Sequence, residues 1–389
     1  MVTTTGRRWA AVLACLLATA ACSEGNEEDE AVPVVPEATL TLTPSEVDAG
    51  SVRDIDIQLE NFGDVEVYTA LEDSSADVIY LGHVDSTDDG LIGRFFFGLL
   101  GEGTAQWGLG TPEVSATDNF EIAPATAPEP LSDGLAAAEG TLSGAGDFAA
   151  WSISGLEGQV LFVRTRDLGN SDFEPRMWLL AEDGRTRIPT CCAQAGESML
   201  VMRSDSDAAY YLRIDDAQGG GGEDFSYVLD RASVDPGELV GVDEEEPNNS
   251  VEEAQGLGAL SDGGWVISGQ TSHGGPGDKG EKFGGDLELF SFSVLSDSYA
   301  SMTLAWGNED ADLDVLLFDG DSEELTLSFD SESIVDTSMA TTAPVEQGTV
   351  FLEAGRNYVL LVTSFMDVGP SDWTLDVAVV PAAFPGGSR

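Results

Sequence analysis

Basic side chains and histidines are scarce in this sequence. It holds 16 Lys and Arg against 71 Asp and Glu, which gives a formal net charge of -55 at pH 7. Such a surface repels phosphate backbones and anionic lipid headgroups, so nucleic-acid binding and a basic membrane-surface role are disfavoured and cations are the natural partners. The two histidines, His83 and His273, lie in no HExxH helix, and no Gly-x-Ser-x-Gly elbow occurs. A carboxylate pair of the glycosidase type remains an alternative, because such pairs are defined by their separation in space.

Cysteine is equally sparse, with four residues in 389. Cys15 and Cys22 lie near the N-terminus, and the other two are the adjacent pair Cys191 and Cys192. One neighbouring pair cannot form a disulfide framework across a fold. We interpret the pair as buried thiols or an incidental bridge, with a redox switch or a metal thiolate site as alternatives.

Residues 1–21 have the pattern of an export signal. Two arginines precede an apolar run that is too short for a stable membrane span, and small residues then lead to Cys22. The Ala-Ala-Cys ending resembles the lipobox of bacterial lipoproteins, although Thr19 stands where Leu is usual. The resemblance implies cleavage before Cys22 and acylation of its thiol. A conventional signal peptidase site after Ala21 is the alternative.

An acidic stretch at 22–36 follows, and we expect it to be a disordered tether. These features predict an exported outer-membrane lipoprotein that faces the periplasm or the cell surface. The acyl group is then its one contact with a membrane, because the acidic domains supply none.

Residues 37–124 read as short strands of alternating pattern, separated by turns at Asp48-Ala49-Gly50, Asn61-Phe62-Gly63 and Asp88-Asp89-Gly90. This rhythm is typical of a β-sandwich. The stretch from Leu42-Thr43-Pro44-Ser45 to Gly63 resembles an immunoglobulin-like module of bacterial surface proteins. A Pro-rich joint follows at 123–130 and predicts a semi-rigid linker.

An internal repeat occupies the remainder of the chain. The segment Gly-Asp-Phe-Ala-Ala-Trp-Ser-Ile-Ser at 146–154 aligns without a gap on Gly-Asp-Leu-Glu-Leu-Phe-Ser-Phe-Ser at 285–293. A Leu-Leu block ending in Asp-Gly at 179–184 matches 316–320, and a Tyr 14 residues before an Asp-aromatic pair closes both copies. Three blocks in one order indicate two related domains. We predict that Trp151 and Phe290, four residues after the shared Asp, face inward on equivalent strands.

Both copies resemble the bacterial pre-peptidase C-terminal (PPC) domain, a jelly-roll-like module found beside secreted proteases and in surface proteins. The resemblance covers 130–235, in a degenerate form, and 242–381. Each copy has alternating strands and no long stretch of helical period. The expected fold is therefore all-β, with three consecutive β-sandwiches, one immunoglobulin-like and two jelly-roll-like, after a signal peptide and a tether.

The resemblance implies a calcium site in the second copy. In related collagen-binding domains, an acidic stretch ending in Asn and a later acidic turn coordinate calcium. Carried over, the ligands are Glu244, Glu246, Asn248, Asn249, Asp286 and Glu288. Calcium takes six to eight hard oxygens, so carboxylates and amides from two segments suit it. The first copy lacks the Asn pair and has Ala149 in place of Glu288, so its site is expected to be lost. The alternative is that the acidic run solvates a linker and the Asn pair makes a turn.

Two further patterns are less specific. Asp310, Asp312 and Asp314 alternate at period two, and we interpret them as the solvent-exposed face of a sheet in preference to a second cation site. Aromatic residues in the second copy are candidates for a binding face, although most Trp in small sandwiches are core. They are Trp265, Trp306, Phe365 and Trp373.

The sequence thus favours a non-catalytic, lipid-anchored cell-surface or periplasmic protein. We expect its β-sandwich modules to bind an extracellular polymer or protein, with calcium stabilising the last domain. An accessory, substrate-binding protein of a secreted hydrolase, or an unrecognised hydrolase, is the alternative.

Overall fold

The computed structural model of this chain describes most residues between 38 and 383. They are residues 38–60, 69–71, 78–87, 90–110, 115–131, 138–168, 172–188, 193–194, 197–204, 206–271, 274–276, 283–285, 287–308, 310–322, 327, 334–336, 345–364 and 370–383. The expected signal peptide, the tether with Cys22, the Cys191–Cys192 pair, His273, Asp286 and Phe365 lie outside them. No helix in the described ranges is both long and apolar enough to cross a membrane.

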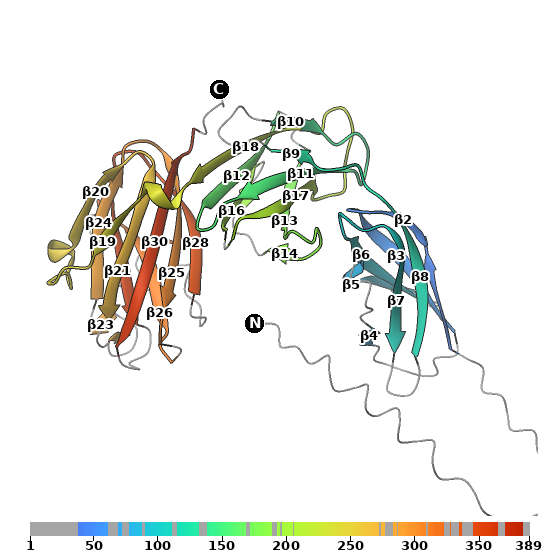
Figure 1. Cartoon of the computed structure of the whole chain (residues 1–389), viewed down its shortest axis with the longest axis horizontal. Coiled ribbons are helices and arrows are strands. Elements are labelled where there is room, and N and C mark those ends of the chain that lie inside the picture. The colour runs from blue at the N-terminus through green and yellow to red at the C-terminus, as the bar shows by residue number, and fades with distance from the viewer. Residues whose placement is uncertain are drawn as a thin grey trace, which may run out of the picture.

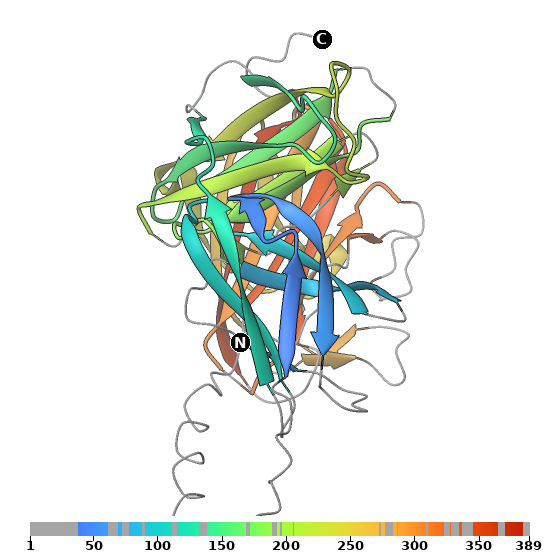
Figure 2. The same ribbon diagram turned by 90° about the vertical axis from the view of Figure 1, so that its right-hand side faces the viewer.

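The described chain is almost entirely β-structure, and Figure 1 shows three sandwiches in a row. Its helices are two single 3-10 turns, η1 (Pro236–Glu238) and η2 (Val251–Glu253). The view from the side places the first sandwich in front of the other two along the row (Figure 2). The expected all-β fold of consecutive sandwiches is confirmed.

The first sandwich has two four-stranded sheets. One has the order β1 (Thr39–Thr43), β3 (Val52–Glu60), β6 (Gly90–Phe97), β5 (Val78–Thr87), and the other β2 (Glu46–Asp48), β8 (Ser115–Ala123), β7 (Gly103–Gly110), β4 (Thr69–Leu71). This order is that of an immunoglobulin-type domain, with the first strand divided between the sheets. Alternation places Leu40 and Leu42 inward, onto a core built around Phe95, Trp107 and Phe120.

The second and third sandwiches each pack two five-stranded sheets. In the second, the orders are β10 (Ala138–Thr141), β18 (Ser226–Val234), β12 (Val160–Asp167), β16 (Glu197–Arg203), β15 (Ala193–Gln194), and β14 (Arg187–Ile188), β13 (Pro175–Leu180), β17 (Ala208–Asp216), β11 (Phe148–Gly155), β9 (Glu129–Pro130). In the third they are β19 (Leu239–Asp243), β21 (Gly263–Thr271), β30 (Ser371–Pro381), β25 (Ser298–Trp306), β28 (Val345–Leu352), and β20 (Gln255–Leu260), β24 (Leu287–Val294), β29 (Asn357–Ser364), β26 (Leu313–Asp319), β27 (Ile334–Asp336). A hairpin, β22 (Gly274–Pro276) with β23 (Phe283–Gly285), completes the third.

The internal repeat is confirmed by strand order and register. Trp151 in β11 lies opposite Leu212 in the antiparallel β17 and beside the parallel edge strand β9. Phe290 in β24 lies opposite Leu360 in the antiparallel β29 and beside the parallel edge strand β20. Both rings are buried in the core of their sandwich. The predicted equivalence of these two inward positions therefore holds.

The expectation that the Asp310–Asp314 run is solvent-exposed is wrong for two of its three residues. Asp310 is exposed, but Asp312 and Asp314 are buried. In β26 the residues Leu313 and Val315 face the core, so Asp314 is on the opposite, outer face of the sheet. That outer face carries a second apolar cluster, onto which side chains of the 251–254 segment and Leu327 pack. The sheet is thus covered on both sides there.

The first and second sandwiches meet at an apolar contact with a polar margin. Phe96 and Leu99 pack on Trp178 and Leu180. Beside them, the buried Arg213 donates from Nε to the Gly50 carbonyl at 2.6 Å, across the junction.

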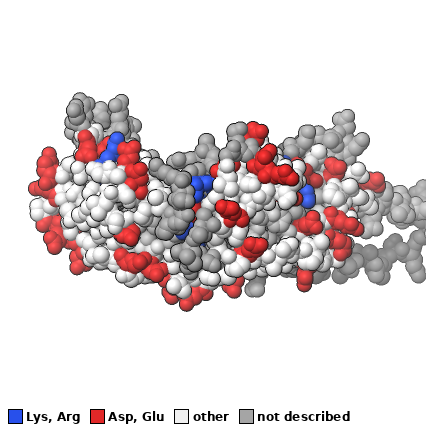
Figure 3. Space-filling model, turned by 90° about the horizontal axis from the view of Figure 1, so that it is seen from above, with Lys and Arg blue, Asp and Glu red and all other residues white. Residues whose placement is uncertain are grey.

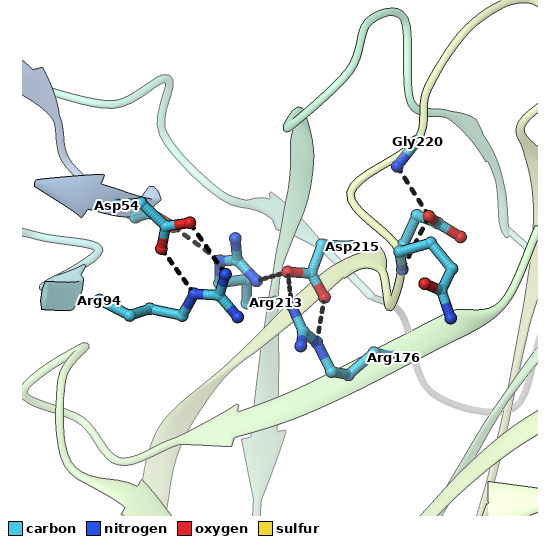
Figure 4. A network of polar contacts seen from close by, with 9 residues as sticks. Asp54, Arg94, Arg176, Arg213, Asp215 and Gly220 are labelled. Carbon is cyan, nitrogen blue, oxygen red and sulfur yellow. Dashed lines mark hydrogen bonds and ion pairs between the residues drawn. The ribbon is translucent and has the colours of Figure 1, made fainter. Parts of the chain in front are cut away.

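Three ion pairs lie at and beside that arginine (Figure 4). Arg213 and Arg176 both bind the carboxylate of Asp215, and Arg94 pairs with Asp54 from the first sandwich. The junction therefore gathers several of the few basic residues of this acidic chain.

The second and third sandwiches share a second apolar contact. Residues of β12, β16 and β18 pack against Tyr299, Ala378 and Val380 of the third sandwich. Arg203 and Asp376 form an ion pair across the same junction. The last sandwich is therefore not an isolated body.

Candidate metal centre

The segment between β19 and β20 crosses from one sheet of the last sandwich to the other. The Glu244 amide donates to the Ser268 carbonyl in β21 at 2.9 Å, and the Asn248 carbonyl accepts from the Leu289 amide in β24 at 3.2 Å. These two bonds hold the ends of the acidic run on different sheets. The residues between them lie at the open edge of the sandwich.

Three carboxylates meet at this edge. Glu244, Glu246 and Glu288 each offer an oxygen, and these oxygens all lie within 4.8 Å of one another. Glu288 is fully buried and alternates with Phe290 on the inward face of β24, whereas Glu246 is exposed. Calcium binds oxygens at about 2.3–2.6 Å, so oxygens this close fit around one ion.

Asn248 adds an unsatisfied amide to the same place. Its side chain is fully buried, and neither Oδ1 nor Nδ2 has a hydrogen-bond partner. Its backbone amide donates to Oε2 of Glu246 at 3.0 Å, and its carbonyl binds the strand next to Glu288. A buried amide without a partner costs about 1–3 kcal/mol. A cation bound through Oδ1 satisfies that oxygen.

Asn249 occupies the centre in a different way from the one expected. Its Oδ1 accepts the Leu287 amide at 2.8 Å, and its Nδ2 donates to Oε2 of Glu246 at 3.0 Å. It therefore positions β24 and the Glu246 carboxylate. Of the six expected ligands, the structure brings together Glu244, Glu246, Asn248 and Glu288, with Asn249 as their support, and Asp286 lies outside the described residues.

The middle sandwich has no acidic side chain at the matching position. Ala149 lies opposite Ile214 in β17, just as Glu288 lies opposite Val362 in β29. Among the described residues, the one cluster of three or more acidic side chains close enough to share a metal ion lies in the last sandwich. In the middle sandwich this region borders a cleft of about 550 Å³ at the first junction. Its lining includes Asp48, Arg53, Glu129, Glu139, Asp147 and Trp151.

The proposed aromatic face is not formed by the residues that suggested it. Trp265, Trp306 and Trp373 are buried in the core of the last sandwich, because their strands turn these positions inward. Phe365 lies outside the described residues. On the face that Figure 3 shows, the charged side chains are mostly acidic and are scattered over all three sandwiches.

Sequence reasoning missed two polar groupings. One is the arginine cluster at the first junction, whose members come from three separate segments and share no motif. The other is the burial of Asp312 and Asp314. The sequence did contain a signal for the burial of Asp314. Residues 313–318 are an apolar run broken by Asp314 alone, and such a run is typical of a strand covered on both faces.

Comparison with known proteins adds only distant likenesses. No family model matches the chain, and no curated protein matches it. A structure of tripeptidyl peptidase 2 is 10% identical over 88% of this chain and 33% of its own, with a TM-score of 0.20. The chain thus spans about a third of that peptidase.

Two carbohydrate-related structures are similarly distant. A protein crystallised with a xylogluco-oligosaccharide is 11% identical over 89% of this chain and 80% of its own, with a TM-score of 0.21. The CBM22-1–CBM22-2 tandem of Paenibacillus barcinonensis Xyn10C is 11% identical over 63% of this chain and 87% of its own, with a TM-score of 0.20. Values this low carry no functional inference.

Proposed function

We propose that this chain is a non-catalytic binding protein whose last β-sandwich is stabilised by calcium. The observation that carries the proposal is the meeting of three carboxylates next to the backbone of Asn248, a fully buried residue whose carboxamide has no hydrogen-bond partner. Glu244, Glu246, Glu288 and Oδ1 of Asn248 would hold the ion, and water would complete its shell. Hard oxygen donors of this kind suit calcium.

The role of the ion would be to hold the entry segment, residues 244–248 between β19 and β20, against the sandwich. Glu244 and Glu246 belong to the segment, whereas Glu288 belongs to β24. Without a cation, three carboxylates repel one another within 4.8 Å. A bound ion links segment and strand and fixes how the chain enters the last sandwich.

The first experiment compares thermal melting of the whole chain in calcium and in chelator. A ligand that binds the folded state alone stabilises it by about 2.7 kcal/mol at a hundredfold excess over Kd. We expect a higher melting temperature in calcium, and we expect Glu288→Gln to abolish the difference. The matched control is Glu245→Gln, which removes an exposed carboxylate from the same run and should keep the response. Identical melting of the unaltered chain in calcium and chelator would contradict the calcium site.

The same proposal places the chain outside the cytoplasm, tethered by an acyl group on Cys22. The Ala-Ala-Cys ending and the acidic stretch after it support this placement. Replacing Cys22 with Ala should release the protein from the membrane fraction and abolish acylation, because the acidic domains give no attachment of their own. Unchanged retention of the Cys22→Ala chain would remove the lipid anchor from the proposal.

The partner of such a protein would be an extracellular polymer or another protein. The polar cleft at the first junction, about 550 Å³ in volume, is a place where a ligand could contact two sandwiches at once. An accessory role beside a secreted hydrolase is the second candidate function and would use the same cleft.

A further inference from the structure

A buried polar patch lies on the outer face of the β24–β29–β26 sheet, opposite to the face that carries Glu288. Its members are Asp312, Asp314 and Thr363, which are 6%, 3% and 0% exposed. Thr363 in β29 lies directly opposite Asp314 in β26. Directly opposed residues in an antiparallel pair project from the same face, with Cβ atoms about 4.5–5.5 Å apart. Asp312 comes two residues before Asp314, at the entrance to the strand.

All three side chains have an oxygen without a partner. Oδ1 of Asp312, Oδ2 of Asp314 and Oγ1 of Thr363 are buried and make no hydrogen bond. Within the described part of the chain, neither aspartate forms an ion pair. Burying one unpaired carboxylate costs several kcal/mol, and two neighbouring ones add their mutual repulsion. A native fold does not keep such a group without something that compensates its charge.

Three occupants can be compared for this patch. A proton on Asp314 neutralises one carboxyl group but leaves the buried charge of Asp312 uncompensated. A water molecule satisfies lone pairs but leaves two like charges uncompensated. A divalent cation matches the charge of both carboxylates and accepts the neutral hydroxyl as a third oxygen ligand.

The electrostatics of the patch disfavour two negative charges at once. Burial, and then the charge of Asp312, raises the pKa of Asp314 to about 7. Burial also raises the pKa of Asp312. The two acids are thus close enough to act on each other.

The loop that carries Asp312 is fixed by the core. The buried indole of Trp306 donates from Nε1 to the Ala311 carbonyl at 2.9 Å, and the Ala311 amide donates to the Asn308 carbonyl at 3.0 Å. These bonds set the backbone immediately before Asp312. The backbone that presents Asp312 is therefore held in place before any ligand arrives, which lowers the cost of binding.

We propose that Asp312, Asp314 and Thr363 hold a second divalent cation in the last sandwich. The site is distinct from the first, because Glu288 faces the core side of the sheet and Asp314 faces its outer side. Calcium is the probe of choice, since the donors are hard oxygens. The inference does not depend on the Glu244–Glu288 centre and is tested separately from it.

The test measures calcium binding to the whole chain by equilibrium dialysis in about 0.15 M monovalent salt, which screens the diffuse surface charge. The unaltered chain should bind two equivalents tightly. Asp314→Asn and Glu288→Gln should each bind one, and the double variant none. The matched control is Asp310→Asn, which removes an exposed carboxylate from the same run and should still bind two. Loss of one equivalent in Glu288→Gln alone would support the first centre and overturn the second.

The melting temperature gives an independent readout, because Asp314→Asn is expected to raise it in chelator and to lower it in calcium, relative to the unaltered chain. In chelator, Asp314→Asn should melt higher than the unaltered chain, because it removes a buried uncompensated charge. In calcium that order should reverse, because the variant cannot gain the ion. A variant that melts higher by the same amount in both conditions would overturn the proposal. Thr363→Val, which removes the orphan hydroxyl at constant shape, should weaken calcium binding about tenfold and not destabilise the chain in chelator.

Discussion

At the scale of single residues, Phe290 and Trp151 are core anchors at matching points of two sandwiches. Phe290 is fully buried against Trp373, and Trp151 donates from Nε1 to the hydroxyl of Tyr227 at 3.1 Å. The second copy therefore fills its position with an apolar ring, whereas the first combines a larger ring with a hydrogen bond. Burial raises the pKa of the Tyr227 hydroxyl.

Truncation of either ring should be costly. We expect Phe290→Ala and Trp151→Ala each to lower the free energy of unfolding by about 3–5 kcal/mol, because the cavity cannot close between two packed sheets. Denaturant titration of the whole chain measures this. Phe351→Ala, which removes a partly exposed ring from the same sandwich as Phe290, serves as the control and should cost far less. Equal losses for Phe290 and Phe351 would contradict the core role.

At the scale of elements, strand β26 marks the limit of what the sequence could predict. The repeat was predictable because the block around Trp151 and the block around Phe290 keep the same residue types at the same spacing. The burial of Asp314 was not, because alternation describes one strand and cannot tell what covers its second face. The apolar part of that face is covered by Val251 of η2, Ala254 and Leu327, which lie far from Asp314 in sequence or beyond the end of its strand.

The same limit applies to the metal centre. The acidic run and the Asn pair could be identified from the sequence, and so could Glu288. The separate roles of Asn248 and Asn249 could not be predicted, because the two residues are adjacent and chemically identical. The backbone turns one carboxamide into the interior and the other onto the Leu287 amide. The register between the entry segment and β24 decides which of the two carboxamides is buried and which accepts the Leu287 amide.

At the scale of the whole molecule, the first junction depends on a glycine. Gly50 has a φ of +79°, and a Cβ built there would lie 2.5 Å from the Phe148 ring and 2.8 Å from Leu99. Its carbonyl is also the acceptor for Arg213. The close approach of the two sandwiches thus requires the absence of a side chain at this turn.

We expect Gly50→Ala to separate the first sandwich from the second without unfolding either. Calorimetry should then resolve an additional transition, and limited proteolysis should cut faster in the linker at 124–128. Gly103→Ala is the matched control, because Gly103 has a similar φ of +86° but nothing within 4 Å of its would-be Cβ. It carries the backbone strain without the clash. If the two variants behave alike, the close packing at Gly50 is not what joins the sandwiches.

The parallel pairing of β2 with β8 has a mechanical consequence. These strands lie next to the entry and the exit of the first sandwich, and their register joins Glu46 to Glu121, Val47 to Ile122 and Asp48 to Ala123. A pull that draws the two ends of this domain apart moves parallel neighbours in opposite directions along their length. Their hydrogen bonds are then strained together in shear and do not open one after another, as they would at a hairpin end. Tension along the row that passes beyond β1 would therefore load this short pair in shear.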